Sequence, residues 1–206
     1  MAEYQKALVT FIDILGFRNL VMDAGDSGAQ KVDGILTILL KLKEISKLGR
    51  SVTDRGVVRS VTRSMAFSDC IVRVNFIHSE RLYWAVDAEI ALLGNIQPEL
   101  ACRGVLIRGG ISFGDLYIGE TNDVLFGPAL VRAYELSENH AIYSRIILDS
   151  MILERVGTED LGLMKDGDGI HFVDYLWRSC GQYWASTFNQ EWEFFWKSIS
   201  SQQRKS

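Results

Sequence analysis

The segment that most constrains the fold is LVTFIDILGF, residues 8–17, in which a carboxylate interrupts an otherwise apolar run. Its β-branched and aromatic residues predict a central strand, and Gly16 permits a tight turn into a helix beginning near Arg18. A lone carboxylate at the end of a buried strand is costly unless it is neutralised, hydrogen-bonded or bound to a cation. Asp13 is therefore the first candidate for a functional residue.

Length and composition bound the class of protein. The 206 residues, 48% apolar and 23% charged, are typical of a single soluble globular domain. The net charge of −4 disfavours a nucleic-acid partner, and no apolar run approaches the roughly 18–20 residues of a membrane span. The N-terminus lacks signal-peptide features, and the three cysteines are scattered, so we expect a cytoplasmic protein without disulfides or a zinc motif.

Hydrophobic periodicity and turn residues predict an alternation of strands and helices. Helices are expected at residues 30–48, 81–104 with a break near Pro98, 128–140 and 182–206, and extended segments at 6–15, 56–77, 104–119, 123–127 and 143–150. The segment 56–77 is predicted to be a hairpin with Ser68 and Asp69 at its bend. This order favours an α+β fold with a mostly antiparallel sheet covered by helices.

Two carboxylates are expected at one edge of that sheet. Asp13 ends the first strand and Asp69 lies at the hairpin bend, so neighbouring strands would bring them together. Two acidic residues and substrate phosphates suit Mg²⁺ or Mn²⁺, and two such ions about 3.5–4 Å apart can serve a phosphoryl transfer. The helix after Gly16 offers free N–H groups to phosphate. Singly, Asp13 would be interpreted as a helix N-cap and Asp69 as a turn residue.

These segments, in this order, resemble the class III nucleotidyl cyclases. The family pattern F-x-D-I-x-G-F matches FIDILGF at residues 11–17, and the second metal aspartate matches Asp69 of FSDC. The family's arginine-glycine strand is similar to LIRGGISFGDLYIG, and Gly127 matches the glycine that opens the next helix. The likeness covers about residues 5–150 and implies a ferredoxin-like core, with a helical C-terminal elaboration at about 151–206.

The resemblance also implies a site and a reaction. Two Mn²⁺ or Mg²⁺ ions would be held by Asp13, the Ile14 carbonyl and Asp69, with Gly16 and Phe17 at the phosphates. The 3′-hydroxyl of a nucleoside triphosphate would attack its α-phosphate, giving a 3′,5′-cyclic monophosphate and pyrophosphate. The family works as a head-to-tail homodimer with active sites between the subunits.

Several family positions differ in this chain. Met65 stands where purine-using members carry a base-reading lysine, and Val124 stands at their base-reading aspartate. Val131 and Glu135 replace the asparagine and arginine of the family helix. The usual purine contacts and both usual transition-state groups are therefore missing.

Nearby cations are candidate replacements. Arg108 in the IRGG strand and Arg132 in the following helix are the candidate catalytic arginines, because a guanidinium suits phosphate oxygens. Arg63 shares strand parity with Met65 and could face the same pocket, and Tyr134 could pack against a base. Taken singly, each arginine could equally be a solvated surface residue and Tyr134 a core residue.

A cyclase domain with altered base contacts is similar to the pyrimidine cyclases of bacterial Pycsar anti-phage systems. We therefore expect conversion of UTP to cyclic UMP, a messenger that acts on a separate effector. The alternatives are a cytidylate cyclase making cyclic CMP, and a purine cyclase with unmatched base contacts. A non-enzyme alternative is a degenerate cyclase-like domain that binds a nucleotide or a partner without turnover.

Overall fold

A computed structural model of the chain describes residues 3–24, 29–46, 62–119 and 124–176. Its α-helices are α1 (Phe17–Ala24), α2 (Ala29–Ser46), α3 (Leu82–Cys102), α4 (Pro128–Asn139) and α5 (Ser150–Val156), with a short 3₁₀ turn, Ser79–Arg81, before α3. Its strands are β1 (Gln5–Ile14), β2 (Thr62–Phe67), β3 (Cys70–Phe76), β4 (Ile107–Ile118), β5 (Leu125–Phe126), β6 (Ile146–Leu148), β7 (Leu163–Lys165) and β8 (His171–Val173).

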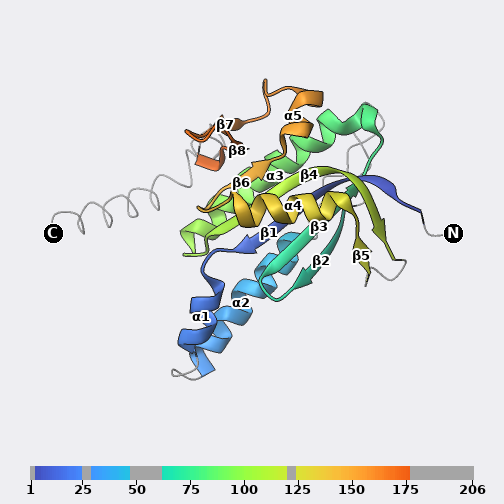
Figure 1. The fold of residues 1–206 in the computed structure, drawn as a ribbon. Helices are drawn as coiled ribbons and strands as arrows, with labels where there is room; N and C mark the ends of the chain where they lie inside the picture. Colours follow the sequence, from blue (N-terminus) through green and yellow to red (C-terminus); the bar gives the residue numbers. More distant parts are fainter. Residues whose placement is uncertain (1–2, 25–28, 47–61, 120–123, 177–206) are drawn as a thin grey trace.

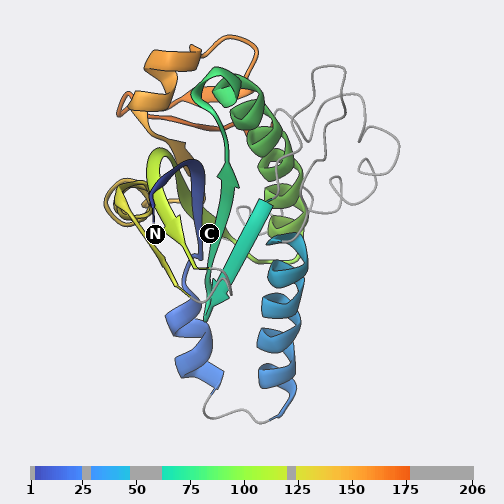
Figure 2. The same ribbon diagram turned by 90° about the vertical axis from the view of Figure 1, so that its right-hand side faces the viewer.

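The described strands form one sheet in the order β2-β3-β1-β4-β6-β8-β7, with β5 paired to β4. Each of these pairings is antiparallel except that of β4 with β6. Helices cover both faces, because α2 and α3 lie along one face and α4 along the other (Figures 1 and 2). The α+β prediction, with a mostly antiparallel sheet, is confirmed.

The alternation of β1 builds both halves of the core. Leu8, Ile12 and Ile14 belong to the larger apolar cluster, which includes the buried face of α3. Val9 and Phe11 belong to a second cluster with the inner face of α4. Successive side chains of a strand point to opposite faces, so odd-numbered Asp13 shares the α4 face.

The close approach of α4 to the sheet depends on a glycine in β4. A Cβ built on Gly110 would lie 2.3 Å from the Ala133 carbonyl oxygen and 2.6 Å from the Leu136 Cβ. Any larger residue at position 110 would therefore push α4 away from β4. The glycine pair of IRGG is thus a packing feature of the strand that carries Arg108.

The expected break of a helix near Pro98 is wrong, since α3 runs unbroken from Leu82 to Cys102. Proline removes one backbone hydrogen bond, but the surrounding turn is held by its packing. Ile96 and Leu100 are buried in the larger core cluster, and the Gln97 amide donates a hydrogen bond to the Ser144 carbonyl at 3.2 Å. These contacts keep the chain helical through the proline.

Residues 150–173 contribute a helix and two strands that the sequence patterns did not indicate. β8 pairs with β6, and β7 pairs with β8, so this segment extends the sheet beyond β6. The Asp149 carboxylate accepts a hydrogen bond from the Met151 amide and so caps α5. The expected helix at 182–206 lies outside the described residues.

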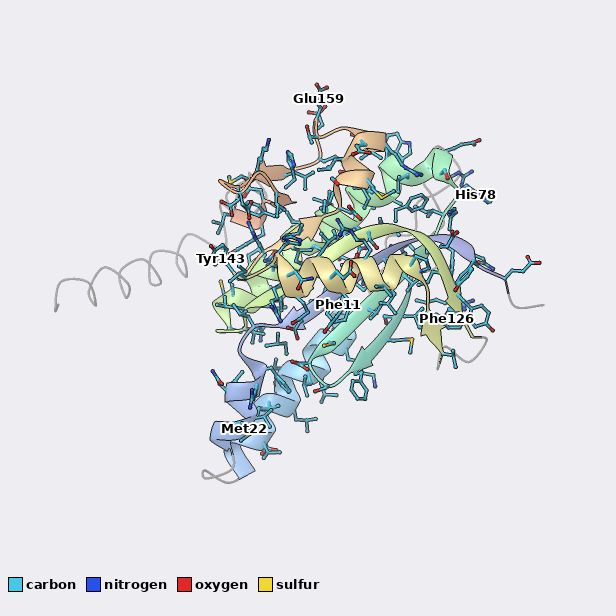
Figure 3. All side chains as sticks on the ribbon, in the orientation of Figure 1. Phe11, Met22, His78, Phe126, Tyr143 and Glu159 are labelled. Atoms are coloured by element: carbon cyan, nitrogen blue, oxygen red, sulfur yellow. The ribbon has the colours of Figure 1, made fainter. Side chains whose placement is uncertain are left out.

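One further feature is the pair formed by α1 and α2, which extends from one end of the sheet (Figure 1). Met22, on α1, is 71% exposed and lies on this extension, away from the sheet (Figure 3).

Among the described helices, none combines the length and apolar character that crossing a lipid bilayer demands.

Candidate active site

The end of β1 lies beside the turn between β2 and β3. β1 and β3 are antiparallel, with Ile12 opposite Ile71, and the turn closes with Phe67 opposite Cys70. Ser68 occupies the left-handed region with φ 53°, which lets two residues reverse the chain. The predicted hairpin is confirmed, and the first strand, β1, lies beside it, which is the condition on which the two carboxylates were expected to meet.

Two carboxylates and a thiol meet at this edge of the sheet. The ligand atoms of Asp13, Asp69 and Cys70 all lie within 4.8 Å of one another. The Cys70 Sγ is 3.6 Å from the Asp13 Oδ1 and 3.9 Å from the Asp69 Oδ1. In the described part of the chain, no other group of three such residues is arranged to hold a metal ion.

Arg108 holds the other side of the Asp13 carboxylate. It stands opposite Asp13 in the pairing of β1 with β4, and its Nε donates to the Asp13 Oδ2 at 2.9 Å. Its Nη2 donates to the Glu138 Oε1 at 2.5 Å, and its Nη1 to the Ser137 carbonyl at 3.5 Å. The guanidinium therefore joins the candidate metal carboxylate to the C-terminal end of α4.

The protonation of the cluster follows from burial and repulsion. Burial raises the pKa of Asp13 above its ordinary value, the hydrogen bond from Arg108 opposes that rise, and the Asp69 charge adds to it. Burial also raises the pKa of the Cys70 thiol to about 12, with Asp13 and Asp69 contributing. An added cation would relieve the repulsion between the two carboxylates.

The donor set fits a divalent cation. Two carboxylates on separate strands supply the hard oxygen ligands that Mg²⁺ and Mn²⁺ prefer, and they leave room for water and phosphate oxygens. Asp13 Oδ2 is engaged by Arg108, so its Oδ1, on the side of Asp69 and Cys70, is the oxygen available to an ion. Asp13 and Asp69 would hold the ion, and the thiol of Cys70 is a third potential donor.

The predicted phosphate turn follows directly. Gly16 adopts φ 79°, which L side chains rarely adopt, and its carbonyl accepts from the amides of Asn19 and Leu20 at 3.0 and 3.3 Å. Phe17 begins α1 and packs against the larger core cluster. Ile14 ends β1 with its side chain buried opposite Ile107. The first residue of α1, Phe17, thus follows Asp13 by only four positions, so the amides that open the helix are close to the carboxylate in sequence.

Arg132 has its contacts elsewhere in the same chain. Its Nε and Nη2 donate to the Asp149 carboxylate at 2.9 and 3.3 Å, and its Nη1 is 3.9 Å from Glu135. Asp149 is buried, so this pair fastens α4 to the start of α5. Within the chain, the structure does not bring Arg132 to Asp13 and Asp69.

The other predicted substrate residues lie on neighbouring elements. Tyr134 on α4 is 49% exposed, and its ring meets the Phe11 ring edge-to-face at 5.4 Å. Arg63 and Met65 lie on β2, opposite Val74 and Val72 of β3. The Arg63 guanidinium also lies 5.9 Å from the centre of the Phe76 ring.

Two residues at the site were not among the sequence predictions. Cys70 directly follows Asp69, and a search for metal-ligand types next to each candidate aspartate would have found it. Glu138 lies one helical turn beyond Tyr134 on α4, yet nothing in the sequence pairs it with Arg108, 30 residues away. Only the packing of α4 across the sheet shows that contact.

The fold is that of class III nucleotidyl cyclase domains. The guanylyl cyclase domain of the RhoGC fusion protein from the aquatic fungus Blastocladiella emersonii superposes with a TM-score of 0.58 at 15% identity, covering 83% of this chain and 95% of that one. The catalytic core of a rhodopsin-guanylyl cyclase with converted specificity, in complex with ATPαS, gives 0.55 at 15% identity over 83% and 96%.

A bacterial protein shares the fold over part of its length. A class III adenylyl cyclase-like ATP-binding protein from Pseudomonas aeruginosa gives a TM-score of 0.52 at 15% identity, over 74% of this chain and 35% of that one. No protein-family model matches the sequence, and no curated protein matches it. The shared fold therefore confirms the expected architecture, while the activity of this chain has to be argued from its own site.

Proposed function

We propose that the protein is a nucleotidyl cyclase that converts UTP to 3′,5′-cyclic UMP and pyrophosphate. The observation that carries this proposal is the meeting of Asp13 and Asp69 at one edge of a cyclase-type sheet, with ligand atoms within 4.8 Å. A site with two carboxylates, the amides of Phe17 and Arg18 at the start of α1 and an adjacent arginine suits a triphosphate and its counter-ions.

In the proposed reaction, the ribose 3′-oxygen attacks the α-phosphorus, its proton leaves to solvent, and pyrophosphate departs. Divalent cations, when bound, would supply charge for the phosphate oxygens and make the 3′-hydroxyl more acidic. The chain itself contributes positioning: Asp13 and Asp69 fix the ions, and the first turn of α1 binds phosphate. Arg108 acts as a positioning residue, because its Nε binds the Asp13 Oδ2 and so leaves Oδ1 to face an ion.

We place the second half of each active site on a second copy of the chain. Val131, Arg132, Tyr134 and Glu135 are all about half exposed, so this face of α4 is open to a partner. In a head-to-tail dimer this face would meet the carboxylates of the other subunit. Arg132 would then supply the positive charge that an arginine supplies in other members of the family, at the position that Glu135 occupies here.

The pyrimidine preference rests on the side chains at the two base-reading positions. Met65 and Val124 are apolar and cannot form the polar contacts that a lysine and an aspartate make to a purine. A site without those groups loses its discrimination in favour of purines. From the sequence resemblance, we propose that the cyclic UMP serves as an anti-phage messenger for a separate effector.

Product identification tests the proposal. Purified protein is incubated with Mn²⁺ and each of the four ribonucleoside triphosphates, and products are identified by mass. Cyclic UMP from UTP is expected from the unmodified protein and not from Asp69→Asn. Glu159→Gln is the matched control, because Glu159 is exposed at the far end of the molecule (Figure 3).

The other outcomes distinguish the alternatives. Cyclic CMP as the main product would make the protein a cytidylate cyclase, and cyclic AMP or GMP would make it a purine cyclase. No cyclic product from any triphosphate would favour a nucleotide- or partner-binding domain. That last alternative has one specific observation in its favour, the absence of the usual asparagine and arginine at Val131 and Glu135.

A further inference from the structure

The cluster formed by the Asp13 and Asp69 carboxylates also contains a sulfur atom, that of Cys70. Magnesium and manganese chemistry requires oxygen ligands, and Cys70 adds a soft donor that this chemistry does not need. Cys70 is the first residue of β3, and its position is fixed by the closing pair of the turn, Phe67 opposite Cys70. The thiol is therefore held beside both carboxylates by the same backbone that places Asp69.

The two sulfur–oxygen separations are close to those of a tetrahedral site, and the carboxylate oxygens lie within 4.8 Å of each other. Zinc bound at about 2.3 Å to sulfur and about 2.0–2.2 Å to oxygen places sulfur and oxygen ligands about 3.5–3.7 Å apart. The Cys70 Sγ lies 3.6 Å from the Asp13 Oδ1 and 3.9 Å from the Asp69 Oδ1. One distance already fits, and the other requires a movement of a few tenths of an ångström by a side chain at a turn.

The orientation of Asp13 favours the same arrangement. Arg108 binds the Asp13 Oδ2 at 2.9 Å, so the carboxylate presents Oδ1 toward the sulfur. Asp69 and Cys70 are only half-buried, which leaves the cluster open for a further ligand from solvent or substrate. Three protein donors with one open position are typical of a tetrahedral zinc site that binds an exogenous ligand.

We propose that Cys70 is a third metal ligand and that the Asp13–Asp69–Cys70 cluster binds thiophilic divalent cations, of the Zn²⁺ type, more tightly than Mg²⁺ or Mn²⁺. On binding, the Cys70 S–H bond is replaced by a metal–sulfur bond and the proton is released to solvent. A tetrahedral ion with one open position leaves fewer places for phosphate oxygens than an octahedral one. Zinc is thus expected to compete with the activating ion and to inhibit cyclisation.

This inference rests on the carboxylate site of the proposed function, but it does not require that the protein be catalytically active. The probe is Cd²⁺, whose bond to a thiolate gives a charge-transfer absorption in the ultraviolet. The full chain carries three cysteines, so the background is Cys102→Ser with Cys180→Ser, which retains Cys70 alone. Cys102 is exposed, and its replacement leaves the cluster untouched.

The expected result is a cadmium–thiolate band that saturates at one ion per chain in the single-cysteine protein. Adding Cys70→Ser should abolish the band. It should also weaken Cd²⁺ binding, measured by calorimetry, at least as much as the roughly 10- to 100-fold that loss of an outer-shell partner costs. Asp13→Asn should weaken it as well, whereas Mn²⁺ binding should change little on Cys70→Ser.

The results that would overturn Cys70 as a ligand differ from those that would overturn the proposed function. A single-cysteine protein with no thiolate band, or Cd²⁺ binding unchanged by Cys70→Ser, overturns Cys70 as a ligand, even where Mn²⁺ still binds through Asp13. A thiolate band in a protein that cyclises no nucleotide supports the ligand assignment and overturns the cyclase proposal instead.

Discussion

Asp13 carries the electrostatic cost of the site. Its folded-state pKa is raised above the ordinary value of 3.8, chiefly by burial and also by Asp69, even though Arg108 donates to it. The charged carboxylate is thus less favourable in the folded protein without ions than in the unfolded chain. A bound cation reverses this balance, so the site links stability to metal and to pH.

The pH dependence of Asp13→Asn tests this linkage. A raised folded-state pKa means that the stabilising contribution is complete below pH 3.8, the unfolded value, and is lost as pH rises through the folded-state pKa. In chelator, the variant should therefore gain in melting temperature relative to the unmodified protein as pH increases from 4 to about 7. A difference that is constant across this range would contradict the raised pKa.

Manganese should stabilise the unmodified protein through the same residue. At an ion concentration about 100 times the dissociation constant, binding to the folded state adds about 2.7 kcal/mol to the free energy of unfolding. We expect a corresponding rise in melting temperature that Asp13→Asn and Asp69→Asn lose and Glu159→Gln retains. An equal rise in all four proteins would place the ion elsewhere.

Among the elements, α3 is fastened to the sheet by a buried ionic network. Arg73 of β3 is paired with Glu89 of α3 at 2.7 and 3.0 Å, and both side chains are at most 3% exposed. Thr10 of β1 donates to the same carboxylate at 3.0 Å. The network joins the two strands that position Asp13 and Cys70 to one helix.

Removal of the Glu89 side chain should therefore strongly lower the free energy of unfolding. Glu89→Ala leaves the Arg73 guanidinium buried without its carboxylate, and breaking a buried pair in this way costs about 3–5 kcal/mol. Urea unfolding should show this loss, while Glu159→Ala should change the free energy of unfolding by less than about 0.5 kcal/mol. A loss below about 1 kcal/mol for Glu89→Ala would contradict the assigned network.

The packing of α4 on β4 gives a second prediction about elements. Gly110→Ala introduces a methyl group 2.3 Å from the Ala133 carbonyl and should destabilise the protein by about 1–3 kcal/mol. Gly34→Ala in α2 is the matched control, because no atom lies within 4 Å of the added Cβ. The control should stabilise by about 0.5–1 kcal/mol, since alanine is the better helix residue. Equal effects of both changes, measured by urea unfolding, would contradict the close approach.

The sequence predicted β1 and the hairpin, because β-branched and aromatic runs and turn residues are local signals. The meeting of Asp13 with Asp69 was predicted only on the condition that their strands are neighbours, and the pairing of β1 with β3 meets that condition. The sequence did not indicate β7 and β8, whose three residues each are too short to show a period. The break at Pro98 was wrong, because burial of the flanking turns outweighs one missing hydrogen bond. The Arg108–Glu138 contact depends on tertiary packing, which no local pattern contains.

For the whole molecule, the proposed head-to-tail dimer makes a prediction about mixed subunits. Asp69→Asn and Arg132→Gln should each be inactive, and refolding them together should restore about a quarter of the activity, because half of the dimers then contain one intact site. Mixing Asp13→Asn with Asp69→Asn should restore none, since both changes damage the same half-site. Full activity of Arg132→Gln alone, or no recovery on mixing, would contradict the shared site.

The most direct test of the account is the position of manganese in a crystal of the full chain with Mn²⁺ and 3′-deoxy-UTP, which lacks the attacking hydroxyl. The anomalous signal of manganese should lie between the Asp13 and Asp69 carboxylates, against the triphosphate, and should disappear in Asp69→Asn. Manganese and triphosphate bound away from these two side chains would contradict the central claim.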